Sequence, residues 1–103
     1  MKLHDIAHAR TGDKGDTSNI SLIAYDPKDF QRLRNYVTPE RVAAHFNTFP
    51  ADNITRYELP QLYALNFVIR NALSGGVTRS LAQDAHGKCL ASVLLTMEIG
   101  PER

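Results

Sequence analysis

The stretch "HARTGDKGDTSNISLIAY", residues 8–25, carries the information that decides the fold of this chain. An apolar-leaning segment runs into polar and glycine residues at 11–17 and then returns to Ile, Leu, Ile and Ala. Residues 2–10 are predicted to form a first strand, and residues 19–25, apolar on both faces, are typical of a central strand. The residues between them are rich in glycine and aspartate, which favours a turn. The turn is also a candidate binding site.

Two helix starts follow this stretch. In Asp26-Pro27 and in Thr38-Pro39, an Asp or Thr side chain can accept a hydrogen bond from the free amides of the first turn, and proline fits the first helical position. The sequence therefore predicts two short helices that begin at these sites, with the second ending near Asn47.

The second half predicts one more strand, a helix and a hairpin. Residues 53–59 have strand character, and Pro60 is expected to open the helix with the strongest apolar pattern, which Gly75 and Gly76 would end. The apolar side of that helix would be formed by Leu62, Leu65, Val68, Ile69 and Leu73. Residues 77–83 and 88–99 are expected to form a hairpin around "DAHG". The alternating apolar face of its last strand would be formed by Cys89, Ala91, Val93, Leu95, Met97 and Ile99. This order predicts an α+β fold, a ferredoxin-like sandwich with a mainly antiparallel sheet and helices on one face.

The length, the charge balance and the cysteine content limit the class of protein. With 103 residues one domain is expected. Lys plus Arg is 12 and Asp plus Glu is 11, and the net charge of +1 gives no electrostatic reason to expect nucleic acid. A single cysteine, Cys89, cannot form an internal disulfide, which favours a reducing, cytoplasmic location. The N-terminus lacks the pattern of a signal peptide, and no apolar segment approaches the roughly 20 residues of a membrane span.

The residues Gly12-Asp13-Lys14-Gly15-Asp16 are the first candidate site. They do not match a phosphate-binding P-loop, because Gly15 follows the lysine and the next element is a strand. They do not match a calcium loop, because the carboxylates do not alternate over about twelve residues. What remains is a bent loop that presents backbone amides, Lys14 and nearby Arg10 to an anion. The alternative is a connection whose Asp side chains cap its own backbone.

A second candidate site is "ALSGGVTRS", residues 72–80. Gly75 and Gly76 would permit the close approach of a ligand, and Arg79 suits a carboxylate or phosphate. The alternative is a helix stop with a surface arginine. A catalytic role for the hairpin tip at 83–88 is not favoured, because such tips are usually solvated. No metal site is expected, because His4 and His8 would lie about 13 Å apart on one strand, and no cofactor is expected.

Several separated blocks resemble the AtuA-like ferredoxin-fold domain family, over residues 3–99 as one domain. They are "ARTGDKGDTSNISLIAY", "RYELPQLYALNFVIRNALSGGVTRSLAQDAHGK" and "LASVLLTMEI". The residues that carry the resemblance are Arg10 to Gly15, Asn19-Ile20, Ala64 to Phe67 and Gly75-Gly76. The resemblance implies a relative of the C-terminal part of the acyclic terpene utilisation protein AtuA, in bacterial catabolism of branched acyl compounds, with no established catalytic residues. This chain has Ser21 where the family pattern often has glycine.

The leading hypothesis is an accessory domain or small subunit, non-catalytic on its own, that assembles with a separately encoded large AtuA-like protein. It would contribute an anion-binding edge for a branched acyl-CoA or carboxylate. The candidate ligand-binding residues are Arg10, Gly12, Asp13, Lys14, Gly15, Asp16, Asn19, Gly75, Gly76 and Arg79. One alternative is an independent enzyme that acts on a small acid or thioester at a homo-oligomer interface, with proton transfer by Asp13, Lys14 and Asp16. The other is a structural homo-oligomer without a ligand.

Overall fold

A four-stranded antiparallel sheet with the strand order β1-β2-β4-β3 forms the centre of the molecule. The structure, a computed structural model, describes residues 1–14, 16–47, 50–71 and 88–100. The strands are β1 (Ala7–Lys14), β2 (Thr17–Ala24), β3 (Ile54–Leu59) and β4 (Ala64–Ile69).

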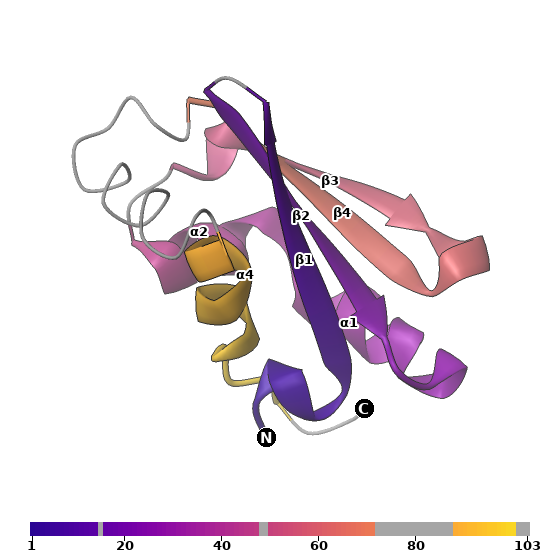
Figure 1. Cartoon of the computed structure of the whole chain (residues 1–103). Coiled ribbons are helices and arrows are strands. Elements are labelled where there is room, and N and C mark those ends of the chain that lie inside the picture. Colours follow the sequence, from indigo (N-terminus) through magenta and orange to yellow (C-terminus); the bar gives the residue numbers. More distant parts are fainter. Residues whose placement is uncertain (15, 48–49, 72–87, 101–103) are drawn as a thin grey trace.

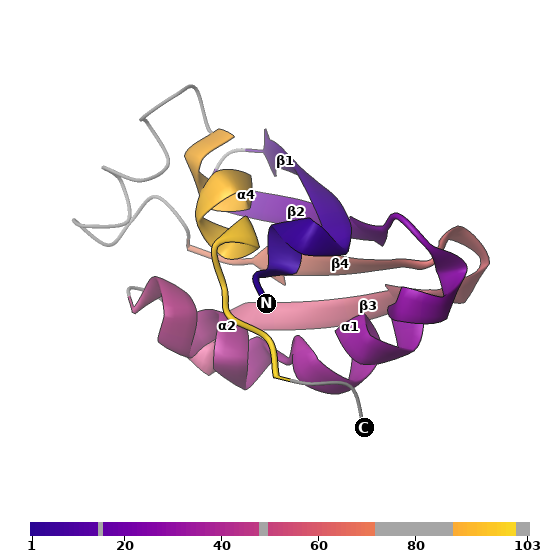
Figure 2. The same cartoon turned by 90° about the horizontal axis from the view of Figure 1, so that it is seen from below.

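Helices cover one side of this sheet, as Figures 1 and 2 show. Those in the described part of the chain are α1 (Phe30–Tyr36), α2 (Pro39–Phe46) and α4 (Lys88–Leu95). Short 3-10 turns are η1 (Leu3–Asp5), η2 (Pro27–Asp29), η3 (Ala51–Asn53) and η4 (Pro60–Leu62). The predicted class is confirmed: the fold is α+β, with an antiparallel sheet and helices on one face.

The register of the strands places the core between the sheet and the helices. Ile20 lies opposite Thr11 of β1 and opposite Phe67 of β4, and the next inward position of β2 is Leu22, opposite Leu65. All four apolar residues named here are fully buried. Cross-strand neighbours on one face of a sheet are in contact, so these pairs form one continuous apolar layer. Leu33, Val37, Val42, Leu90 and Leu94 pack on it from the helices.

Both predicted helix starts are confirmed. The Asp26 side chain accepts a hydrogen bond from the backbone N–H of Lys28 at 3.1 Å, ahead of η2 and α1. The Thr38 side chain accepts one from the N–H of Arg41 at 3.2 Å, ahead of α2. α2 ends at Asn47, which adopts the left-handed conformation with φ 58°. Caps are local interactions, which is why the sequence alone located these helices.

The first hairpin differs from the prediction in its boundaries. Residues 3–5 form the turn η1, and β1 extends to Lys14, which pairs with Thr17. Residues 12–14 therefore belong to a strand and not to a loop. β2 is a central strand, as predicted, but only one of its faces is buried, because its burial alternates from one residue to the next.

The predicted helix over residues 60–73 is wrong. Only the turn η4 forms after Pro60, Tyr63 adopts the left-handed conformation, and residues 64–69 form β4. β4 lies between β2 and β3, where hydrogen bonding on both edges favours the extended chain. Its buried residues Leu65, Phe67 and Ile69 recur every second position, as a strand requires. Leu73, Gly75, Gly76 and the predicted strand 77–83 lie outside the described residues.

The predicted strand over residues 88–99 is also wrong. Residues 88–95 form α4, which packs against β1 through fully buried Leu90 and Leu94. These two residues are one helical turn apart, so the same apolar sequence also satisfies a helical period. Within this segment, extended pairing occurs only after α4, where the N–H of Leu3 donates to the carbonyl of Met97 at 2.8 Å.

Arg56 ties β3 to the end of α1, and its replacement tests that link. Its Nη1 donates to the carbonyls of Arg34 at 2.7 Å and Val37 at 2.9 Å, and its Nη2 contacts Glu58 at 3.2 Å. A lysine cannot reproduce this planar fork, so Arg56→Lys should lower the free energy of unfolding by about 1–2 kcal/mol in urea denaturation.

Glu58→Gln is the matched control for that prediction, because it removes only the exposed ion partner. The side chain of Glu58 is 40% exposed and that of Arg56 is 17% exposed. Exposed ion pairs contribute little, so this variant should lose less than about 1 kcal/mol. Equal losses in the two variants would show that the carbonyl contacts do not stabilise the fold.

Candidate functional site

The side of the sheet that faces away from the core is not covered by any helix in the described part of the chain (Figures 1 and 2). We call this surface the outer face. Its described members follow from the register. They are His8, Arg10, Gly12, Thr17, Asn19, Ser21, Ile23, Thr55, Tyr57, Leu59, Ala64, Asn66 and Val68. All of them except Ala64 are partly or fully exposed.

Strand alternation divides the first candidate motif between the two faces. Arg10 and Gly12 lie on the outer face, whereas Thr11 faces the core and its hydroxyl accepts a hydrogen bond from the N–H of Ala91 in α4 at 3.0 Å. Thr11 therefore joins β1 to α4, and the two residues beside it are presented to the surface.

The remaining predicted residues of the first site lie at or near the hairpin turn. Asp13 pairs with Ser18 and Lys14 with Thr17 through the backbone, and their side chains lie outside the described part, as does Gly15. Asp16 is exposed in the turn. The second predicted site, Gly75, Gly76 and Arg79, lies wholly outside the described residues. Its approach to the first site stays a prediction.

Asn19 and Gly12 are direct cross-strand partners on the outer face. A Cβ atom on Gly12 would stand 3.2 Å from Nδ2 and 3.5 Å from Oδ1 of Asn19. The missing side chain at Gly12 therefore leaves room for the Asn19 amide beside the strand that carries Arg10. This gives the glycine a packing role that the sequence did not show.

A row of polar side chains crosses the outer face next to this pair. Arg10 lies opposite Ser21, Ser21 opposite Asn66, and Asn66 opposite Tyr57. Nδ2 of Asn66 donates a hydrogen bond to Oγ of Ser21 at 3.0 Å. We call these four residues the polar row. Of these four, only Arg10 is a site residue predicted from the sequence, because the other three join it through strand pairing that a linear pattern does not reveal.

Large apolar side chains gather at the end of the sheet where β3 and β4 are joined. Tyr25 is 65% exposed, Leu62 63% and Tyr57 52%. Leu59 lies two residues after Tyr57 on the same face, and the ring of Tyr25 stacks on His8 with the ring centroids 5.2 Å apart. We call this group the aromatic end; its members are His8, Ile23, Tyr25, Tyr57, Leu59 and Leu62. Soluble proteins rarely expose such a contiguous group without a partner.

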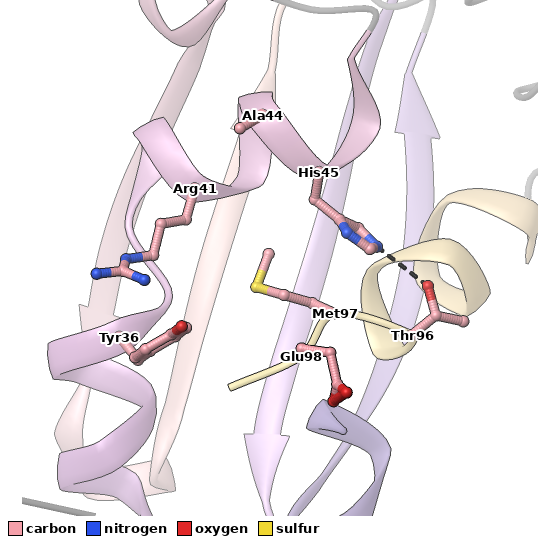
Figure 3. Close-up of a pocket in the computed structure, with 7 residues that line it drawn as sticks. All are labelled: Tyr36, Arg41, Ala44, His45, Thr96, Met97 and Glu98. Atoms are coloured by element: carbon pink, nitrogen blue, oxygen red, sulfur yellow. Dashed lines mark hydrogen bonds between the residues drawn. The ribbon is translucent and has the colours of Figure 1, made fainter. Parts of the chain in front are cut away.

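A shallow pocket of about 390 Å³ lies on the other side of the molecule, between α2 and the segment that follows α4 (Figure 3). The Arg41 guanidinium stacks on the ring of Tyr36, 3.9 Å from its centroid. Nε2 of His45 lies 2.7 Å from the carbonyl oxygen of Val93 and 3.0 Å from Oγ1 of Thr96. These contacts hold the ends of α2 and α4 together. No residue of the predicted sites lines the pocket.

The described residues contain no group of three or more His, Cys, Asp or Glu side chains that could hold a metal ion. His4 pairs with Asp5, with Nδ1 3.4 Å from Oδ1, while His8 stacks on Tyr25. Within the described ranges, no helix combines the length and the apolar character needed to cross a membrane.

Gly12→Ala tests the packing of Asn19. The new methyl group would lie 3.2 Å from Nδ2 of Asn19, so the amide should turn away from β1. Gly12 does not adopt a left-handed conformation, so the strand should persist, with a change in the free energy of unfolding below about 1 kcal/mol. NMR should show a clear shift of the Asn19 side-chain amide signals.

The double variant Gly12→Ala with Asn19→Ala is the matched control for that prediction. With the amide absent, the methyl group meets no obstacle, so this variant should be at least as stable as Asn19→Ala alone. Unchanged Asn19 signals in Gly12→Ala would contradict the contact.

Comparison with known proteins supports the reading of the fold. No curated protein and no solved structure matches the chain significantly. A family model does match, under the description "AtuA ferredoxin-like domain", over residues 1–100. The match spans both hairpins, α1, α2 and α4, and therefore includes the whole outer face. The chain belongs to the AtuA ferredoxin-like domain family.

Proposed function

We propose that this chain is an accessory domain that docks through its outer face onto a large AtuA-like protein. The observation that carries the proposal is the aromatic end on a sheet face that no described helix covers. Membership of the AtuA ferredoxin-like domain family supports the identity of the partner. In this role the domain brings the polar row to a site for an anionic substrate, such as a branched acyl-CoA or carboxylate.

The composition of the surface favours a protein partner. Tyr and Arg are enriched among the residues that dominate binding energy at interfaces, and Tyr supplies a large rigid contact with a polar end. Tyr57 and Leu59 project from β3, and Tyr25 stacks on His8 of β1 at the opposite edge of the sheet. The aromatic end therefore extends across the width of the sheet and offers a broad contact in place of a single anchor.

The described part of the chain gives less support to an independent enzyme. The outer face offers an arginine, hydroxyls and amides, which bind and orient a substrate, and one imidazole, His8, whose ring is stacked on Tyr25. Proton transfer would need an acid or base placed beside the reacting group. The side chains of Asp13 and Lys14 lie outside the described part, so their proposed chemistry stays a hypothesis, while docking has a described surface behind it.

Copurification with a large AtuA-like protein tests the proposed function. The tagged domain should capture the large protein when the two are expressed together. The double variant Tyr57→Ser with Leu59→Ser should weaken capture at least about tenfold, which corresponds to about 1.4 kcal/mol, because it removes two large apolar contacts from the aromatic end.

A second double variant is the matched control for capture. Gln31→Ser with Ala44→Ser changes two exposed residues on α1 and α2, on the other side of the sheet, and should bind like the unmodified chain. Absence of capture by the unmodified chain, or equal capture by both variants, would overturn the proposal. If light scattering shows a dimer of the unmodified chain, and the variant Tyr57→Ser with Leu59→Ser is a monomer, then a second copy covers the outer face instead.

A further inference from the structure

Arg10 is a cation on the outer face with no acidic partner in the described structure. The described outer-face positions contain no Asp or Glu, and Glu58, the acid of β3, lies on the alternate face beside Arg56. The side chain of Arg10 is exposed, and no hydrogen bond or ion pair joins it to the side chain of another described residue. A guanidinium of this kind has five N–H donors available to an incoming anion.

The neighbours of Arg10 in the polar row also present donors. Because Nδ2 of Asn66 donates to Oγ of Ser21, the Ser21 hydroxyl acts there as an acceptor and keeps its own hydrogen. Asn66 keeps a second N–H. Directly opposed side chains of an antiparallel pair lie about 4.5–5.5 Å apart, so the guanidinium of Arg10 and the Ser21–Asn66 pair can bind one anion from two sides.

The chemistry of these groups suits a carboxylate. One arginine matches the single charge and the two oxygens of a carboxylate through paired N–H donors. The hydroxyl of Ser21 and the amide of Asn66 can donate further hydrogen bonds to the same carboxylate without adding charge.

The surface beside the polar row is apolar. Successive residues on one face of a strand are about 6.6–6.8 Å apart, and the next positions along from Ser21 and Tyr57 are Ile23 and Leu59. A carboxylate bound at Arg10 would therefore have its carbon chain directed over an aliphatic and aromatic surface. A short aliphatic acid would contact both the polar row and this apolar surface.

We infer that Arg10, Ser21 and Asn66 form a binding site for the carboxylate of a small aliphatic acid, whose carbon chain lies toward Ile23. The inference rests on the proposed function in that a docked partner would close the open side of this site. It does not need the partner for its test, because the three residues are all on this chain.

Titration of the isolated protein followed by NMR tests the site. Isobutyrate should shift the Arg10 Nε–H and the Asn66 side-chain amide signals in a saturable way below about 100 mM, since an exposed ion pair binds weakly. Isobutyramide has the same shape without the charge and should bind at least tenfold more weakly. The variant Arg10→Gln should bind isobutyrate at least tenfold more weakly. The control Lys28→Gln removes a charge at an exposed residue of η2 and should leave isobutyrate binding unchanged.

The outcomes separate this inference from the proposed function. Equal responses to isobutyrate and isobutyramide, no saturation, or full binding by Arg10→Gln would each overturn the carboxylate site. A third outcome is that the unmodified chain does not respond to isobutyrate while Arg10→Gln loses partner capture. Arg10 would then bind a carboxylate side chain of the partner, which overturns the small-acid site and leaves docking intact. Isobutyrate binding by a chain that captures no large protein would overturn docking alone.

Discussion

The strand register is the constraint on which the rest of this structure depends. Side chains alternate between the faces of a strand, so a slip of one residue in the pairing of β1 with β2 would exchange the core for the surface. The observed register puts Ile20, Leu22, Leu65 and Phe67 into the core together. It thereby also decides which polar residues emerge on the outer face, because they occupy the positions in between.

The same register gives the motif around Gly12 its meaning. As a linear sequence, residues 10–16 are a charged glycine-rich turn. In the sheet, Thr11 binds the amide of Ala91, Gly12 makes room for Asn19, and Arg10 joins Ser21 in a row that continues across the sheet. The two glycine-rich stretches were expected to act as loops. The described structure places Arg10, Thr11 and Gly12 on a strand instead, so these residues have fixed cross-strand neighbours.

Prediction from the sequence succeeded where the signal was local. The helix starts at Asp26 and Thr38 rest on a side chain and amides two or three residues away. It failed for residues 64–69 and 88–95, whose apolar residues suit both a helical and an alternating period. The secondary structure of these segments depends on the elements they pack against. β4 gains hydrogen bonds from β2 and β3, while α4 buries Leu90 and Leu94 against β1 and its neighbours.

By itself, then, the sequence determined the α+β class, the first hairpin, the two capped helices, the strand β3 and the family, because caps, turns and motif blocks act over a few residues. It also singled out Arg10, Gly12 and Asn19. Only the tertiary structure decided that Ser21, Asn66 and Tyr57 join Arg10, and that Tyr25, Leu59 and Leu62 gather at one end. These groups consist of residues distant in the chain, and only the pairing of four strands brings them onto one face.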